Sequence, residues 1–243
     1  MHQDWFREFA PKITWIEINQ NFQISLLYKF LYVETAKVAC STIKSRLYPY
    51  ILNGLLPPKE VHPGVFGSPF ARPFQLPSDF NKRIISGDDF FRFTFVREPV
   101  ERVLSAYLDK ISRKTPQRER FTAEFKPTLE DDGSISLNTF LNIVRDCGES
   151  RKVDKHWRSL DLLTFQGLID YNFIGCFARF EDDWLRVLDH LGFEKPESKE
   201  SVTWHATSAA SKIEEYVTPQ NRKLIEEIYS KDFELYERVL KSV

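Results

Sequence analysis

Apolar stretches alternate with amphipathic ones along this chain, which predicts strands alternating with helices. Residues 24–33 (ISLLYKFLYV), 90–96 (FFRFTFV) and 171–177 (YNFIGCF) are rich in aromatic and β-branched residues, as strands are. Strands separated by helices are typical of an α/β fold with a mainly parallel sheet. The pattern therefore predicts a central, mainly parallel sheet flanked by helices.

The helices that follow the first two strands have the clearest periodicity. The first has an apolar face that repeats every four residues, made of Ile43, Leu47, Ile51 and Leu55. Asn53-Gly54 and Pro57-Pro58 are expected to end this helix. Pro99 begins the second helix, and its apolar face consists of Val100, Val103, Leu104, Tyr107, Leu108 and Ile111.

Three later helices and two long connections complete the predicted order. The helices are expected at 136–146, 181–191 and 219–241. Gly192 is a suitable C-cap for the second, and Thr218-Pro219 a suitable start for the third. Residues 57–80, rich in Pro, Gly and Phe, are predicted to form a long ordered loop, and the polar residues 113–134 a mobile surface excursion.

Composition limits the classes of protein to which the chain can belong. Its 243 residues are 42% hydrophobic, enough for one sizeable core, so we expect a single domain over 1–243. Lys plus Arg is 34 and Asp plus Glu is 35, and this net charge of −1 disfavours binding nucleic acid through overall charge. Cys40, Cys147 and Cys176 are too widely spaced for a disulfide framework or a zinc site, so no metal is expected.

The N-terminal sequence and the apolar windows of the chain indicate the cellular compartment that we expect. No basic segment followed by an apolar stretch is present at the N-terminus, as a signal peptide would require. No window of the sequence approaches the ~20 apolar residues of a membrane span. We therefore expect a soluble, cytoplasmic protein without a membrane span, and its oligomeric state is left open.

The first strand ends in a short loop, ETAKVACSTIK, that has the composition of an anion site. A strand that turns into a helix N-terminus directs backbone N–H groups and the positive end of the helix dipole at one spot. Lys37 adds a charge, and Ser41 and Thr42 add hydroxyl groups, while Ala36 and Ala39 leave room for close approach to the backbone. The alternative interpretation is an ordinary capped turn between a strand and a helix.

The second strand is followed by a further candidate site in FVREPVERVLSAYLDK. Arg97 stands at the strand end, where ligands gather in open α/β sheets, and Ser105 lies eight residues further on. An arginine and a small hydroxyl can together bind a phosphate. A polar stripe opposite the apolar helix face is predicted from the spacing of Glu98, Arg102, Ser105 and Asp109.

A simpler interpretation of the second segment also stands. Arg97 and Arg102 could merely pair with Glu98 and Glu101 at the protein surface. Surface ion pairs of this kind are common and contribute little to stability.

Together the two segments resemble the nucleotide-binding motifs of the sulfotransferases that use 3′-phosphoadenosine 5′-phosphosulfate (PAPS), especially the carbohydrate branch (chondroitin/HNK-1-type sulfotransferases). The motif of that branch for the 5′ end of the nucleotide is similar to PKVGCTNWKR, where this chain reads TAKVACSTIKSR. Its motif for the 3′ end is similar to FVRDPFERLVSAYRDK, where this chain reads FVREPVERVLSAYLDK. Similar later segments, DKHWRSL among them, follow in the same order, so the resemblance extends over about residues 27–240, interrupted at 57–85 and 113–135.

The resemblance implies a three-layer fold like that of P-loop NTPases, with PAPS as sulfuryl donor and no metal. The first loop would bind the 5′-phosphosulfate, with Lys37 neutralising charge on the bridging oxygen, while Arg97 and Ser105 would bind the 3′-phosphate. Lys212, in a late loop with Ser208 and Ser211, could also reach the nucleotide. The residues expected to bind the nucleotide are Lys37, Val38, Ala39, Cys40, Ser41, Thr42, Lys44, Arg97, Ser105 and Lys212.

The first motif departs from the family pattern in ways that affect its backbone. Thr35-Ala36 replaces a frequent Pro before the lysine, Ile43 replaces Trp, and Ala39 replaces Gly. Alanine does not easily adopt a positive φ. The loop must therefore either avoid a left-handed residue at 39 or adopt one with strain.

Transfer also needs a general base with a pKa near the working pH. His62 ranks first, because related enzymes take their base from the interval between the two motifs. His156, in HWRSL, ranks second, and Glu60 is a further candidate. His205 lies in a late loop that could close over the ligands, and His190, late in a helix, is expected to be structural.

The expected reaction is sulfuryl transfer from PAPS to a hydroxyl acceptor, most simply a carbohydrate, with release of 3′,5′-ADP (PAP). The lack of the anchor carried by Golgi members suggests a bacterial or otherwise soluble relative that acts on a cytoplasmic glycan precursor, a lipid or a small metabolite. Phe66, Phe70, Phe74 and Phe80 could form an acceptor wall or simply a core.

Two other functions compete with sulfuryl transfer. A P-loop nucleotide kinase should carry G-x-x-x-x-G-K-[ST], which the first loop lacks. A non-catalytic nucleotide-binding protein of the same fold would retain the same binding residues and transfer nothing.

Overall fold

The computed structural model describes residues 4–53, 67–149, 153–195 and 209–242. The chain divides into two compact units, each assembled from two segments. Unit 1 comprises Met1–Val96 and Leu160–Trp204, and unit 2 comprises Arg97–Ser159 and His205–Val243. Each unit contains residues from both halves of the sequence. That the whole chain is one domain remains a prediction.

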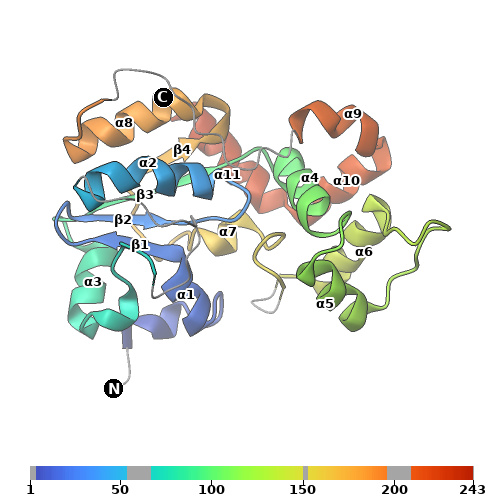
Figure 1. Ribbon diagram of the computed structural model, residues 1–243, viewed down its shortest axis with the longest axis horizontal. Coiled ribbons are helices and arrows are strands. Elements are labelled where there is room, and N and C mark those ends of the chain that lie inside the picture. The colour runs from blue at the N-terminus through green and yellow to red at the C-terminus, as the bar shows by residue number, and fades with distance from the viewer. Residues whose placement is uncertain (1–3, 54–66, 150–152, 196–208, 243) are drawn as a thin grey trace. The chain divides into compact units, whose positions relative to one another are not determined.

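A four-stranded sheet forms the centre of unit 1 (Figure 1). Its strands, in spatial order, are β1 (Phe22–Ser25), β2 (Phe30–Val33), β3 (Phe91–Val96) and β4 (Phe173–Cys176). β1 runs antiparallel to β2, whereas β2, β3 and β4 are mutually parallel. The predicted α/β class with a mainly parallel sheet is confirmed, as are the strands expected at 90–96 and 171–177.

The strand predicted at 24–33 is instead a hairpin, so that prediction was wrong. Lys29 adopts a positive φ of 50°, and the N–H of Tyr28 donates to Oγ of Ser25 at 3.2 Å. These residues turn the chain between β1 and β2, and Leu27 at the tip is 78% exposed. The uninterrupted apolar run concealed the turn because its residues favour strands on either side of it.

The free side of β1 is partly covered by a later segment. Ile24 and Ala71 form an antiparallel bridge, in which each N–H donates to the other carbonyl, at 3.2 Å and 2.8 Å. Pro73 follows two residues later and begins the 3-10 helix η2 (Pro73–Gln75).

Helices cover both faces of the sheet, which gives the three layers that were predicted. In Figure 1, α2 (Cys40–Leu52) and α8 (Phe180–Leu191) lie over one face, and α1 (Trp15–Asn21) and α3 (Ser78–Ser86) lie over the other. The shorter elements of unit 1 are η1 (Asp4–Glu8), α7 (Leu160–Leu163) and η3 (Phe177–Arg179).

The two faces of the sheet have separate aromatic cores. On one face, Phe22 and Leu31 pack with Trp5 and Phe9 from the N-terminal segment. On the other face, Phe95 contacts Phe180 of α8, with ring centroids 5.4 Å apart. Burial of rings on both faces stabilises the sheet against both helical layers.

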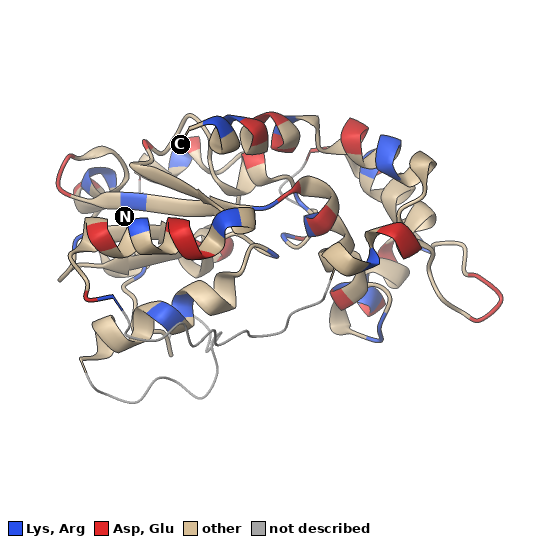
Figure 2. Ribbon diagram, turned by 90° about the horizontal axis from the view of Figure 1, so that it is seen from above, with Lys and Arg blue, Asp and Glu red and all other residues tan. Residues whose placement is uncertain are grey.

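Unit 2 is helical. Its elements are α4 (Pro99–Lys110), α5 (Pro116–Phe125), α6 (Leu137–Cys147), η4 (Ala210–Lys212), α9 (Ile213–Tyr216), α10 (Pro219–Ile228) and α11 (Ser230–Lys241). The predicted apolar face of α4 is buried in the core of this unit together with Phe140 and Trp157. Figure 2 shows acidic and basic residues interspersed along the helices, in keeping with the net charge of −1.

Most of the predicted helices are confirmed. α2, α4, α6 and α8 lie where the periodicity indicated, and Gly192 ends α8 with a left-handed φ of 66°. Asn53 caps α2, whereas the rest of the expected end, 54–58, lies outside the described residues. α3 was missed, because its first residues were assigned to the loop 57–80.

The mobile excursion predicted at 113–134 contains α5, so that prediction was wrong. The hydroxyl of Thr115 accepts the N–H of Arg118 at 3.1 Å, which caps the helix. Phe121 is 2% exposed and belongs to the core of unit 2. Phe121, with the partly buried Phe125 beside it, therefore attaches to the core a helix whose other residues are mostly polar.

The helix predicted at 219–241 is two helices, α10 and α11, separated at Tyr229. Thr218 caps α10 as expected, since its side chain accepts the N–H of Asn221. The hydroxyl of Tyr229 donates to the carbonyl of Trp157 at 2.6 Å. This buried hydrogen bond fixes Tyr229 between α10 and α11, and apolar periodicity does not indicate that the helix is interrupted there.

A buried charge network connects three elements of unit 2. Arg102 of α4 is fully buried; its Nη2 donates to the carbonyl of Arg158 at 2.7 Å, and its Nη1 lies 3.7 Å from Oδ2 of Asp232. Asp232 is also fully buried, at the start of α11. Removing one partner of a buried ion pair costs about 3–5 kcal/mol, because the other charge is left uncompensated.

We therefore expect Asp232→Ala to lower the free energy of unfolding by about 3–5 kcal/mol in urea denaturation. The matched control is Lys231→Ala, which breaks the exposed pair with Glu149 (3.0 Å) and should cost less than about 1 kcal/mol. Replacing both Arg102 and Asp232 by Met and Leu should recover much of the loss. Equal losses for Asp232→Ala and Lys231→Ala would contradict the network.

Candidate functional site

The loop between β2 and α2 is anchored to the sheet of unit 1. Thr35, fully buried, donates its hydroxyl hydrogen bond to the carbonyl of Phe95 on β3 at 3.1 Å. The side chain of Val38 is also fully buried. The loop therefore starts at the carboxyl edge of two parallel strands, which is the edge where open α/β sheets bind ligands.

The backbone of this loop is left-handed at two positions. Lys37 has a φ of 66°, and Ala39, the N-cap of α2, has φ 53° and ψ 24°. Of the two conformations open to residue 39, the chain adopts the strained one. Left-handed residues alternating with others direct successive N–H groups into a concavity suited to anions.

The N-terminus of α2 contributes further donors to the same loop. The first hydrogen bond within the helix runs from the N–H of Ile43 to the carbonyl of Ala39, at 3.0 Å. Helix geometry therefore does not itself use the amides of residues 40–42. Lys37, Ser41 and Thr42 are half-buried, with side chains that retain contact with solvent. A loop with these donors fits a phosphate or sulfate group.

Lys44 differs from the other residues expected to bind the nucleotide. It is 4% exposed, and its Nζ lies 2.9 Å from Oε2 of Glu34, the first residue after β2. Gln23 of β1 donates to the same carboxylate oxygen at 2.8 Å. The side chain of Lys44 thus neutralises a buried carboxylate, and its contact with a nucleotide stays a prediction. Glu34 was missed as its partner, since ten residues separate them in the sequence.

Arg97 is the first residue after β3. It is 9% exposed, and its Nε donates to Oε2 of Glu101 at 3.2 Å, as the simpler interpretation expected. Glu98 does not pair with an arginine in this way; its carboxylate accepts the N–H of Glu101 at 2.7 Å and caps α4. Burial raises the pKa of Glu98, and the helix amides that its carboxylate accepts oppose this shift.

The polar stripe predicted on α4, opposite its apolar face, is buried at its centre, whereas Glu98 and Asp109 at its two ends are half-buried. Ser105 is 2% exposed, and Arg102 is fully buried against Asp232 and the carbonyl of Arg158. Later segments of unit 2 cover this side of the helix, which local periodicity cannot indicate. A role for Ser105 in binding a phosphate remains a prediction.

His156 lies in a turn of unit 2 with a carboxylate partner. Its Nδ1 is 2.6 Å from Oδ1 of Asp154, and the side chain is 18% exposed. Asp154 was not predicted as a partner of His156, although it stands two residues before the histidine in the motif DKHWRSL.

Of the other polar residues predicted for the site or for a loop over it, only Lys212 and Ser211 lie within the described residues. His62, Glu60, His205 and Ser208 lie outside the described residues. Lys212 is half-buried in η4, next to the exposed Ser211.

Most of the described rings that the sequence singled out pack against other rings. His190 stacks on Phe91, with ring centroids 4.7 Å apart, in agreement with a structural role. Phe70 is 3% exposed, and Phe80 packs edge-on against Phe90, whereas Phe74 is 40% exposed. Of the described rings proposed as an acceptor wall, Phe74 therefore retains the most contact with solvent. Phe66 lies outside the described residues.

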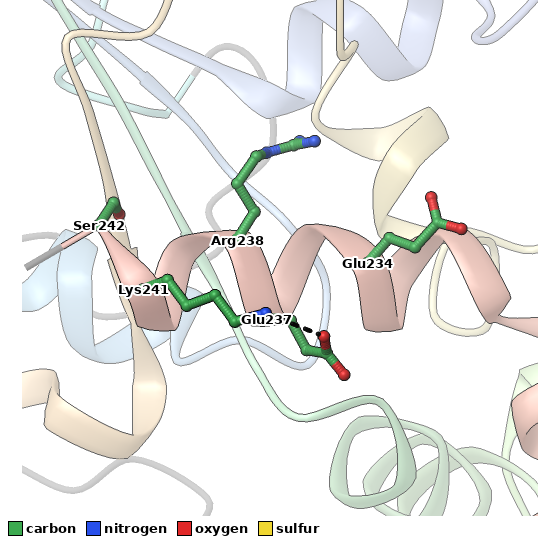
Figure 3. A pocket seen from close by; sticks show the side chains of 5 residues that line it. All are labelled: Glu234, Glu237, Arg238, Lys241 and Ser242. Carbon is green, nitrogen blue, oxygen red and sulfur yellow. Dashed lines mark ion pairs between the residues drawn. The ribbon is translucent and has the colours of Figure 1, made fainter.

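A pocket elsewhere in unit 2 contains none of these residues. It runs along α11 and is lined by Glu234, Glu237, Arg238, Lys241 and Ser242 (Figure 3). Within the described ranges, no cluster of three or more His, Cys, Asp or Glu side chains could hold a metal ion. No helix in the described part of the chain has both the length and the apolar character needed to cross a membrane.

A mainly parallel sheet between two helical layers, with a loop that leads from a strand into a helix N-terminus, defines the class of unit 1 as a three-layer α/β fold. The model of the sulfotransferase family matches residues 20–237, most of the chain. The protein therefore belongs to the sulfotransferase family. No solved structure matches it significantly.

Similar proteins include several carbohydrate sulfotransferases. Carbohydrate sulfotransferase 14 of Homo sapiens is 28% identical over 244 residues, which cover 90% of this chain and 60% of that protein. The Danio rerio protein of the same name is 28% identical, and the match covers 89% of this chain and 62% of that protein. Carbohydrate sulfotransferase 9 of Homo sapiens is 24% identical, covering 96% and 58%. The chain thus spans about 60% of the length of these relatives.

The strained backbone at Ala39 leads to a test by glycine substitution. Glycine adopts a positive φ without strain, but it costs about 0.5–1 kcal/mol elsewhere through the entropy of the unfolded chain. We expect Ala39→Gly to leave the free energy of unfolding unchanged or raised, measured in urea. Ala36→Gly is the matched control, because Ala36 is also half-buried but is not among the positive-φ residues, and it should lose about 0.5–1 kcal/mol. Equal losses in the two variants would contradict the left-handed conformation at residue 39.

Proposed function

We propose that this protein transfers the sulfuryl group of PAPS to a hydroxyl group of a carbohydrate and releases PAP. The observation that carries the proposal is the loop after β2, with left-handed residues at Lys37 and Ala39 leading into the N-terminus of α2. Membership of the sulfotransferase family supports sulfuryl transfer, and the names of the similar proteins support a carbohydrate acceptor.

The loop after β2 would hold the 5′-phosphosulfate of PAPS. Its amides and the hydroxyl groups of Ser41 and Thr42 are donors, and Lys37 is a cation placed within the left-handed turn. The 3′-phosphate would bind Arg97 and Ser105, since these two match the second motif of the family. Binding at Arg97 would require its guanidinium to share or leave Glu101, now at 3.2 Å.

The reaction would be an in-line displacement, in which positioning and charge stabilisation supply most of the catalysis. The acceptor oxygen attacks sulfur while the bond from sulfur to the bridging oxygen breaks. Lys37 would neutralise the charge that develops on that oxygen. A base must remove the acceptor proton, and the candidates are His62 and His156.

The test begins with PAP binding in the absence of metal, measured by calorimetry and by thermal shift. We expect PAP to raise the melting temperature of the wild type, and Lys37→Ala to weaken PAP binding by about 10- to 100-fold, since a charge-assisted hydrogen bond contributes about 1.5–3 kcal/mol. Lys82→Ala, on the exposed side of α3, is the control and should bind PAP like the wild type.

Turnover with PAPS then separates sulfuryl transfer from its alternatives. Lys37→Ala should reduce kcat by about 10²–10³-fold with unsulfated chondroitin or a p-nitrophenyl glycoside as acceptor. A wild type that binds PAP but modifies no acceptor would favour a non-catalytic binding protein. Dependence on ATP and Mg²⁺ would favour a kinase, and a wild type that does not bind PAP would refute the proposal.

A further inference from the structure

A short turn in unit 2 holds a histidine and an aspartate in a defined geometry. Oδ1 of Asp154 lies 2.6 Å from Nδ1 of His156 and also accepts the backbone N–H of His156 at 3.0 Å. The carbonyl of Asp154 accepts the N–H groups of Trp157 and Arg158 at 3.1 and 3.0 Å. Since Trp157 is 5% exposed within the core of unit 2, the turn is fixed to that core.

This geometry selects one tautomer of the imidazole ring. An ionised carboxylate can only accept hydrogen bonds, so Nδ1 of His156 must carry the proton that it donates to Asp154. The lone pair of the neutral ring then lies on Nε2. Within the described residues, Nε2 has no hydrogen-bonding partner, and the side chain remains 18% exposed. Nε2 is thus available to accept a proton from a bound molecule.

The surroundings of His156 favour the neutral form of its ring, chiefly through burial. Burial lowers the pKa of His156; the hydrogen bond and charge of Asp154 oppose that shift, and Lys110 of α4 and the neighbouring Lys155 add to it. The pKa of His156 therefore lies below its ordinary value. A neutral histidine near physiological pH has the protonation state that a general base needs.

The aspartate stays ionised over the same range. Burial raises the pKa of Asp154, but the hydrogen bond and charge of His156, with Arg120 of α5, outweigh it and lower this pKa below the ordinary value. An ionised carboxylate that orients a histidine through Nδ1 also stabilises the imidazolium that forms when Nε2 takes a proton.

His190, in unit 1, provides a comparison, because its ring makes aromatic contacts instead of a contact with a carboxylate. Its ring stacks on Phe91 at 4.7 Å, and Phe173 lies 6.5 Å away. No carboxylate ion pair holds it among the described side chains. Packing between rings would suffice for a structural role, whereas the 2.6 Å contact of His156 fixes the direction of one nitrogen.

We propose that Asp154 is a positioning residue that holds His156 as the general base, with Nε2 as the atom that removes the acceptor proton. This inference rests on the proposed sulfuryl transfer. The acceptor O–H bond breaks, and its proton goes to Nε2. The freed electron pair forms the bond to sulfur, and the bond from sulfur to the bridging oxygen breaks, so that PAP leaves with that electron pair.

The first experiment measures the tautomer without relying on turnover. Nitrogen NMR of the wild type, with His156 assigned by comparison with His156→Gln, should show a neutral ring protonated at Nδ1. In Asp154→Asn a neutral oxygen replaces the carboxylate as acceptor for Nδ1, so this preference should weaken, and the pKa of His156 should fall because the charge that raises it is gone. Asn keeps an oxygen for the N–H of His156, so the turn should survive, as thermal unfolding will check. A ring protonated at Nε2 in the wild type would overturn the proposal.

The second experiment measures sulfuryl transfer from radiolabelled PAPS to unsulfated chondroitin and to p-nitrophenyl glucuronide. We expect His156→Gln to lower kcat by about 100-fold or more, and Asp154→Asn by about 10-fold, with little change in KM for PAPS. The acidic limb of the pH profile of kcat/KM should move to lower pH in Asp154→Asn, in step with the pKa of His156. Asp146→Asn, which removes an exposed carboxylate on α6, is the control and should change neither quantity.

The outcomes separate this inference from the function on which it rests. A wild type that binds no PAP, or transfers sulfate to neither acceptor, removes the proposed activity and the role of His156 with it. Normal PAP binding and wild-type kcat in His156→Gln would refute the base alone. A loss of kcat in Asp154→Asn without a shift of the acidic limb would refute positioning by Asp154.

Discussion

The ion pair between Glu34 and Lys44 is the constraint on which the candidate site of unit 1 depends. Glu34 follows β2 and Lys44 lies in α2, so their 2.9 Å contact joins the two ends of the intervening loop. Buried charges are tolerated only when they are compensated, and Gln23 of β1 completes the compensation of Glu34. Movement of α2 away from the sheet would leave a buried charge without its partner. The loop is thereby held in left-handed conformations that its own residues do not favour.

How much of the fold could be predicted depended on whether the signal was local. The helices α2, α4, α6 and α8 carry apolar periodicity and end signals within their own sequence, and they were predicted well. The β1–β2 hairpin was missed, because apolar residues continue through its turn. The break at Tyr229 was missed for another reason: it is held by a hydrogen bond to Trp157, which lies 72 residues away. Contacts over such distances leave no trace in local periodicity.

The positions of the candidate site residues could likewise be predicted only where the signal was local. Arg97 directly follows β3, Lys37 lies in the loop after β2, and Ser41 lies in the first turn of α2, so the pattern of strand and helix was enough to place them after strand ends. The partners of the charged residues were not predictable, since Glu34 and Asp232 acquire their roles only through packing. Charged residues such as Arg102 and Asp232, whose local sequence resembles an exposed helix face, can therefore be fully buried. Where a side chain depends on one loop alone, its place could be predicted, and its role in binding stays a prediction.

The bridge between Ile24 and Ala71 has a consequence for self-association. An edge strand presents unpaired backbone groups to which a strand from another molecule can add, and β1 is such an edge. The bridge uses both hydrogen-bonding groups of Ile24 on that edge. Pro73, just beyond it, has no N–H to offer, so the covering segment cannot itself continue as a regular sheet strand. The protein thus blocks the growth of its sheet from this side with a short segment of its own chain.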